Sequence, residues 1–230
     1  MFWYYIDMEL TLKIPENLRE ITLGQYQKYL KMEKENEDET FIAQKMVEIF
    51  CSSRLDYIMK MRWTDVQDIV IDLSNMFEQD PKLKKQFTMN GTIYGFIPNL
   101  DEISFGEFVD LDTYIVDWQE MHKAMQVLYR PVKINVRGRY NIEEYKAITD
   151  DTMKDMPLEY ALGAVFFLLN LGKELSAVMM GYLKEGTLKE ESALKEGLIK
   201  SGVGIHHFTK QLKEMLLDMS IYQNKDYTKS

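Results

Sequence analysis

Residues 14–26 read IPENLREITLGQY and residues 97–108 read IPNLDEISFGEF, so one pattern occurs twice in this chain. With one loop residue deleted, both run Ile-Pro, a short loop with Leu, Glu-Ile, a hydroxyl residue, an apolar residue, Gly, Gln or Glu, and an aromatic residue. The hydroxyl residues, Thr22 and Ser104, are 82 positions apart. Because Pro ends a strand and a hydroxyl residue begins a helix, the pattern predicts a strand, a turn and a capped helix, built twice.

Each copy carries the sequence of a capping box. Thr22 is followed three residues later by Gln25, and Ser104 is followed at the same spacing by Glu107. Such pairs satisfy the backbone N–H groups that have no partner at a helix start. The repeat therefore indicates internal duplication. The alternative is that one favourable turn sequence occurs twice by chance.

The first third of the chain predicts a hairpin followed by helices. Residues 8–14 alternate between apolar and polar side chains as a strand does, and residues 2–6 are a plausible partner strand. A helix is predicted from residue 22 to about residue 34. Further helices are predicted over residues 40–54 and 64–77, where apolar residues recur at helical spacing.

The clearest local signal is a second hairpin. Residues 85–89 and 92–96 flank Asn90-Gly91, a pair suited to a two-residue turn with positive φ at both positions. This hairpin leads directly into the second copy of the repeat. A hairpin followed by a capped helix is therefore the unit that we expect to be duplicated.

The second capped helix is predicted to run without interruption over residues 104–129 and to be stopped by Pro131. A short strand pair follows over residues 132–140. Residues 142–151 form an acidic connector. A helix is then expected to run to about Lys184, apolar nearly all round at its start and therefore buried.

The last part of the chain is predicted to be helical. Thr187 and Glu190 form a third capping box, and residues 205–219 carry one apolar stripe.

These elements predict an α+β fold that is mainly helical: a duplicated β-hairpin/capped-helix unit followed by a C-terminal helical bundle. We expect residues 1–150 to hold the two related units, at about 1–35 and 85–130. Residues 153–222 form a helical region packed on them, and residues 223–230 a polar tail.

The composition of the chain limits the classes of function that we expect. The net charge is −9, from 37 acids and 28 bases, which argues against a sequence-independent phosphate-binding surface. A local basic patch is compatible with this total, but no run of Lys and Arg marks one. Nucleic-acid binding is therefore not expected.

The single cysteine, Cys51, excludes an intramolecular disulfide framework and fits a reducing compartment. The start, MFWYYIDMEL, lacks the basic region and cleavage site of a signal peptide. The longest apolar run, residues 161–171, is too short to cross a bilayer. We therefore expect a protein that is neither secreted nor embedded in a membrane. Sixteen methionines suit either a core or an adaptable binding surface.

No catalytic signature is present, and we expect no enzyme, cofactor or metal site. The histidines, His122, His206 and His207, lack the spacing of a metal site. A remote enzymatic alternative uses the acids of the 104–129 helix, where Asp110 and Asp117 are seven apart and would share a face. A solvated face or salt bridges to a partner is the simpler interpretation.

Two stretches carry a resemblance. DLDTYIVDWQEMHKAMQVLYRPV (residues 110–132) and DMPLEYALGAVFFLLNLGKEL (residues 155–175), together with the Ile-Pro entry pattern, resemble segments of poorly characterised proteins of tailed bacteriophages. Such proteins are described as virion or tail-assembly components. The resemblance supplies no catalytic residues and implies a role in the virion or, during assembly, in the host cytoplasm.

Two hypotheses follow from this resemblance. The first is a virion structural protein at the head, portal vertex or head–tail connector. Its expected partners are other phage structural proteins and, in a homo-oligomer, further copies of this chain. The second is a tail assembly chaperone that is absent from the mature particle. For either role, the candidate partner interface consists of residues along the second capped helix: Asp110, Asp117, Trp118, Glu120, Met121, Met125 and Tyr129.

Overall fold

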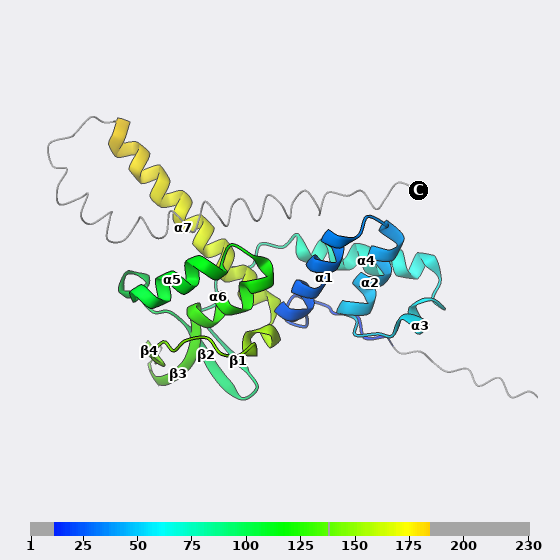
Figure 1. Ribbon diagram of the computed structural model, residues 1–230, viewed down its shortest axis with the longest axis horizontal. Helices are drawn as coiled ribbons and strands as arrows, with labels where there is room; N and C mark the ends of the chain where they lie inside the picture. The colour runs from blue at the N-terminus through cyan, green and yellow to red at the C-terminus, as the bar shows by residue number, and fades with distance from the viewer. Residues whose placement is uncertain (1–11, 138, 185–230) are drawn as a thin grey trace, which may run out of the picture.

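The computed structural model describes residues 12–137 and 139–184, with side chains described as far as Glu174. This part of the chain holds seven α-helices and one four-stranded antiparallel sheet of order β1-β2-β3-β4. The fold is α+β and mainly helical, as predicted. Figure 1 shows two groups of elements, helices α1–α4 on one side and the sheet with α5 and α6 on the other. Helix α7 begins where the two groups meet.

The first group packs around aromatic side chains. Its helices are α1 (Leu23–Glu35), α2 (Glu39–Phe50), α3 (Leu55–Ile58) and α4 (Trp63–Phe77). The ring centroids of Tyr29 and Phe50 lie 5.2 Å apart, and those of Phe50 and Phe77 lie 5.0 Å apart, which are ordinary distances for stacked or tilted rings. The helix predicted over residues 40–54 ends earlier, at Phe50, because Ser52 adopts a left-handed conformation with φ 49°.

The sheet begins with the predicted hairpin. Strands β1 (Gln86–Met89) and β2 (Thr92–Phe96) pair in antiparallel register around Asn90 and Gly91, whose φ angles are 50° and 78°. Both positive φ values are those that a two-residue hairpin turn requires, so this prediction is confirmed. The predicted strand pair after Pro131 is present too, as β3 (Tyr129–Val136) and β4 (Arg139–Ile142).

On one face of the sheet, a tyrosine ring covers a glycine. The ring of Tyr140 lies over Gly95, where an added Cβ would be 2.5 Å from a ring carbon. The Tyr140 hydroxyl donates to the backbone oxygen of Phe96 at 2.7 Å. The glycine therefore gives the ring room to join β4 to β2, two strands away in the sheet.

The second predicted capped helix is not continuous, which corrects the expectation for residues 104–129. The structure has α5 (Phe105–Tyr114), a short 3-10 turn η2 (Trp118–Glu120) and α6 (Met121–Leu128). The break occurs because the Asp117 side chain accepts a hydrogen bond from the Gln119 N–H at 2.9 Å and so starts a new turn. Asp117 followed three residues later by Glu120 is the sequence signal that marks this break.

Helices α1 and α7 (Leu158–Lys184) start side by side. Thr22 and Pro157 form an antiparallel bridge, in which the Leu23 N–H donates to the Met156 oxygen and the Leu158 N–H donates to the Ile21 oxygen, both at 2.8 Å. Two further 3-10 turns, η1 (Leu100–Glu102) and η3 (Thr152–Asp155), complete the described elements. The bridge fixes the start of α7 to the capped start of α1.

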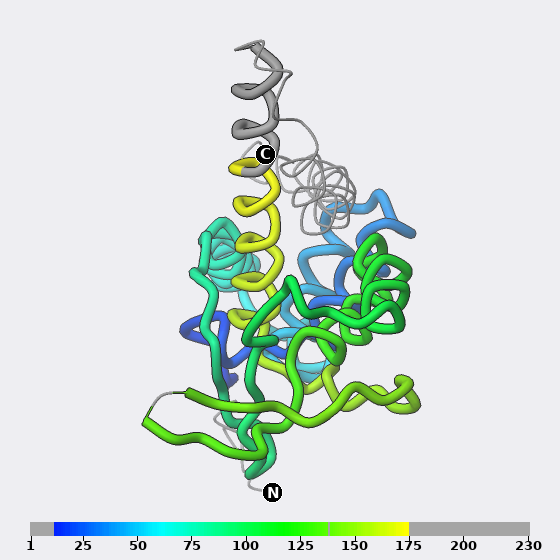
Figure 2. Tube along the Cα trace, turned by 90° about the vertical axis from the view of Figure 1, so that its left-hand side faces the viewer, coloured from blue at the N-terminus to red at the C-terminus, as the bar shows by residue number. Residues whose placement is uncertain are grey.

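The first half of α7 is buried, as its apolar sequence predicts. Leu158, Ala161, Val165 and Leu168 are each at most 1% exposed. The helix then continues outward past α5 (Figure 1). Figure 2 shows it as an upright column with both β-hairpins near its starting end. Among the described residues, no helix combines the length and apolar character that a membrane crossing requires.

Some predictions fall on residues that the structure does not describe. These are most of the first hairpin, the capping box at Thr187 and the helix over residues 205–219. Both capping boxes of the repeat, at Thr22 and Ser104, are present. The duplication of the whole unit stays a prediction because its first hairpin lies outside the described residues.

Two glycines give opposite expectations for the same substitution. In Gly163→Ala the new Cβ would lie 2.8 Å from the Lys82 backbone oxygen, so we expect a loss of about 1–3 kcal/mol in the free energy of unfolding. In Gly106→Ala the nearest atom, on Tyr145, is 4.0 Å away, so we expect a gain of about 0.5 kcal/mol. Urea unfolding of both variants measures these changes. Equal effects would contradict the close packing of α7 on Lys82.

Candidate functional site

The four apolar residues of the predicted interface lie in the core. Met121 and Met125 are 0% exposed, Tyr129 1% and Trp118 6%. Trp118 packs edge-on against Tyr26 of α1 with ring centroids 5.4 Å apart. The prediction that these residues line a partner surface is therefore corrected. The reason is that α6 packs against α5, η3 and β3, so its apolar side is covered by this chain itself.

The acids of the predicted interface do not meet. Asp110 on α5 accepts the Tyr145 hydroxyl, Asp117 caps η2, and Glu120 pairs with Lys123. The break after α5 means that Asp110 and Asp117 do not share a helix face. The shared face on which the enzymatic alternative depends is thus absent from the structure, while a partner role for these acids stays a prediction.

A buried ion pair holds α5 against the sheet. One carboxylate oxygen of Glu107 lies 2.6 Å from Nη2 of Arg130 on β3, and the two side chains are 8% and 13% exposed. The other oxygen accepts the Ser104 N–H at 2.7 Å. Arg130 also lies over the Tyr145 ring, 5.9 Å from its centroid. Glu107 therefore caps its own helix and attaches it to the sheet.

Tyr145 completes this cluster from the connector after β4. Burial, and then its hydrogen bond to Asp110, raise the pKa of the Tyr145 hydroxyl above its usual value, so it stays protonated and donates to Asp110. The connector is thereby tied to α5. These contacts describe a structural clamp between α5, β3 and residues 143–151.

The second polar cluster surrounds His122, a side chain of α6 that is 2% exposed. Its Nδ1 lies 3.1 Å from the side-chain nitrogen of Gln27 on α1, and its Nε2 lies 3.0 Å from Asp151 in the connector. Lys154 donates to the same carboxylate at 2.6 Å. His122 thus joins α1, α6 and the segment that leads into α7.

The surrounding carbonyl groups determine the proton position on His122. The Gln27 nitrogen donates to the backbone oxygens of Trp118 and Gln119, at 2.7 and 3.1 Å, so the amide presents its N–H₂ group to Nδ1. Nδ1 must then accept, and the Nε2–H donates to Asp151. Burial is the main reason that the pKa of His122 lies below its usual 6.5, while the bond to Asp151 opposes this shift.

No pattern in the sequence indicates the His122 cluster. Its partners Gln27 and Asp151 are 95 and 29 residues away along the chain. A lone histidine on an amphipathic helix is compatible with many environments, and only the packing of α6 against α1 selects this one.

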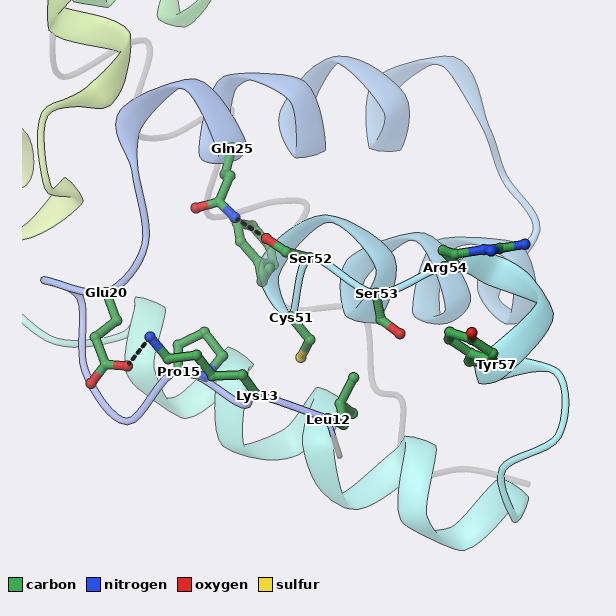
Figure 3. A pocket seen from close by; sticks show the side chains of 11 residues that line it. Leu12, Lys13, Pro15, Glu20, Gln25, Cys51, Ser52, Ser53, Arg54 and Tyr57 are labelled. Atoms are coloured by element: carbon green, nitrogen blue, oxygen red, sulfur yellow. Dashed lines mark hydrogen bonds and ion pairs between the residues drawn. The ribbon is translucent and has the colours of Figure 1, made fainter. Parts of the chain in front are cut away.

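A pocket of about 450 Å³ lies beside the turn after α2 (Figure 3). Gln25 donates to Ser52 at 3.3 Å and to the Ile49 oxygen at 2.8 Å, and Lys13 pairs with Glu20 at 3.7 Å. Figure 3 shows Cys51 between this glutamine and Leu12. The lining is completed by Pro15, Phe50, Ser53, Arg54 and Tyr57.

Several polar groups that line the pocket already have partners. Arg54 forms a two-pronged pair with Asp56, at 3.0 and 3.1 Å. Burial raises the pKa of Cys51 to about 11, so the sulfur is a thiol at neutral pH and a poor nucleophile. This arrangement favours a structural role for Cys51.

The described side chains include no group of three or more His, Cys, Asp or Glu residues placed to hold a metal ion. Comparison of the chain with protein-family models, curated proteins and solved structures finds no match.

The Glu107–Arg130 pair has a direct test. Glu107→Gln keeps a capping side chain, as Gln25 does in α1, but leaves the buried Arg130 charge unpaired. We expect urea unfolding to show a loss of about 2–3 kcal/mol. Glu120→Gln, which breaks a more exposed pair, is the matched control and should cost much less. Adding Arg130→Met to Glu107→Gln should restore part of the loss. A loss that stays unchanged in this double variant would contradict the cost of the unpaired charge.

His122 predicts a pH dependence of stability. Because the folded protein lowers the pKa of His122 below its unfolded value of 6.5, the unfolded chain binds the proton more readily. The free energy of unfolding is therefore expected to fall as the pH decreases from 6.5 toward the folded pKa. Chemical unfolding between pH 5 and 8 measures this slope, because histidine titrates in about this range and carboxylates titrate below it. His122→Gln should flatten it, whereas His206→Gln/His207→Gln should not. A slope that survives His122→Gln would contradict the assignment.

Proposed function

We propose that this chain is a non-enzymatic structural protein of a tailed bacteriophage. It acts through protein–protein interfaces in the head, portal vertex or head–tail connector region. The observation that carries this proposal is an uncovered apolar side chain: Phe105, at the first turn of α5, is 82% exposed. Val109, one turn further along the same helix, is 41% exposed.

The exposed Phe105 can contribute free energy to binding. Burying a large apolar side chain contributes roughly 1.5–3 kcal/mol of favourable free energy, and folding of this chain does not use that energy at Phe105. The backbone at Phe105 is fixed, because the Ser104–Glu107 capping box and the Glu107–Arg130 pair hold the start of α5. A partner that covers this turn would gain the burial energy without having to order the backbone.

The sequence resemblance supports the same role. The stretch over residues 110–132, which resembles tailed-phage proteins, includes the end of α5, η2 and α6. The partners are then other phage structural proteins, together with further copies of this chain. The protein acts in the virion or, during assembly, in the host cytoplasm.

Mass spectrometry of purified particles tests the proposal. Peptides of this chain at a fixed copy number per particle are the expected result. Peptides that are absent from particles but present on assembling tails would replace the structural role with that of a tail assembly chaperone. Purification of a turnover activity that is lost on mutation of Asp110, Asp112 and Asp117 without unfolding would overturn both.

Phe105 provides the mutational test. Phe105→Ser should lower the amount of protein incorporated into particles, because the partner loses its apolar contact. It should change the free energy of unfolding by no more than about 0.5 kcal/mol, as the side chain is exposed. Met59→Ser, at a side chain 63% exposed in the α1–α4 group, is the control and should incorporate normally. Equal incorporation of both variants would contradict a partner contact at α5.

A further inference from the structure

The charges of this acidic chain are segregated. Residues 82–96 and 129–142, which contain all four described strands, hold seven Lys or Arg residues and no acid. The rest of the chain holds the other 21 bases and all 37 acids. The seven cations are Lys82, Lys84, Lys85, Arg130, Lys133, Arg137 and Arg139. Because the two segments are 32 residues apart in sequence, the basic surface forms only when the sheet pairs β2 with β3.

Three of these seven cations lie together on the β3–β4 hairpin, without a partner among the described residues. Lys133, Arg137 and Arg139 are exposed, and in the described part of the chain they form no ion pair. Lys84 and Arg130, by contrast, are neutralised by Glu159 and Glu107. The three hairpin cations therefore carry positive charge that the fold itself does not use.

The same hairpin exposes apolar side chains. Ile134 is 58% exposed and Val136 60%, and they share one face of β3 with Arg139, which lies opposite Val136 in the β3–β4 register. Figure 2 shows the hairpin reaching out beyond the rest of the sheet. A surface that combines two exposed aliphatic side chains with unpaired cations is typical of a contact with an acidic, partly apolar protein surface.

Helix α4 presents the complementary surface. Residues 63–80 hold five acids and no base. Asp68 and Asp72 are exposed one turn apart, and Ile71, between them on the same side of the helix, is 44% exposed. Trp63, at the start of α4, is 49% exposed. Acids and apolar side chains are thus interspersed on α4 as cations and apolar side chains are on the hairpin.

The two surfaces belong to different parts of one chain. Figure 1 shows β3 and β4 at the far end of the sheet group, away from the group that contains α4. A contact between them therefore joins two molecules. It is head-to-tail, so each copy keeps one free surface of each kind and further copies can add.

We propose that the β3–β4 hairpin of one copy docks on α4 of a second copy of this chain, pairing Lys133, Arg137 and Arg139 with its acids and Ile134 and Val136 with its apolar side chains. This deepens the proposed function, on which it rests, by naming a partner and the surfaces that meet. Nucleic acid is the less favoured occupant, because phosphates would approach a chain of net charge −9 and would leave the two aliphatic side chains uncovered.

Two charge-reversed variants of the full chain test the contact. Light scattering at low salt should show the mass of the wild-type protein rising with concentration, and added salt should reduce it. Lys133→Glu/Arg137→Glu/Arg139→Glu and Asp68→Lys/Asp72→Lys should each stay monomeric, since each lacks one surface. An equimolar mixture should associate again, because the intact hairpin of one variant meets the intact α4 of the other and the two reversed surfaces are complementary in charge as well. Lys133→Arg/Arg137→Lys/Arg139→Lys, which keeps the charge, is the matched control and should associate like the wild type.

Specific results would overturn the inference. A hairpin variant that associates like the wild type would exclude this surface, and so would a mixture that stays monomeric. A wild-type protein that stays monomeric but binds duplex DNA, with binding lost in the hairpin variant, would assign the hairpin to nucleic acid instead. A monomeric wild-type protein whose peptides are nonetheless found in particles would refute the self-contact and leave the proposed function standing. Head-to-tail association of a protein that is absent from particles would support the self-contact and refute the proposed function.

Discussion

The paired starts of α1 and α7 are the constraint on which the rest of the fold depends. Two backbone hydrogen bonds of 2.8 Å join Leu23 to Met156 and Leu158 to Ile21. Glu159, in the first turn of α7, then pairs with Arg19 at 2.5 Å and with Lys84 at 2.7 Å. Both cations lower the pKa of Glu159, against the opposing effect of its burial, so the carboxylate stays charged at neutral pH. Because Arg19 precedes α1 and Lys84 precedes the sheet, this one helix start fixes both groups of elements.

The two capping boxes show how similar local sequences acquire different tertiary roles. Gln25 and Glu107 occupy the same position in their helices and accept the same kind of backbone hydrogen bond. The amide of Gln25 also has a donor, which reaches the Ile49 oxygen at the end of α2. Glu107 has only acceptors, and its charge is matched by Arg130. The amide therefore secures a helix–helix contact, whereas the carboxylate secures a helix–sheet contact.

The polar clusters of this protein connect elements that are distant in sequence. His122 joins α1, α6 and the connector, while Asp110 and Tyr145 join α5 to that same connector. The two proposed contacts use other groups, which are the exposed Phe105 and the charged, partly apolar surfaces of the hairpin and α4. Apolar side chains that stay exposed at the edges of the fold are what the proposed role in assembly requires.

Features that depend on short stretches of the chain follow from the sequence. The capping boxes at Thr22 and Ser104, the Asn90-Gly91 turn and the apolar start of α7 were predictable, because a few neighbouring residues fix each of them. The break at Asp117 was readable from its spacing to Glu120, but it competed with a strong helical pattern on both sides. The burial of Met121 and Met125 depends on tertiary packing, since an apolar stripe fits a core and an interface equally well. The same holds for the basic sheet, whose charges come from two separate segments. Contacts between distant segments depend on how elements pack, and packing is a property of the whole chain rather than of any one stretch.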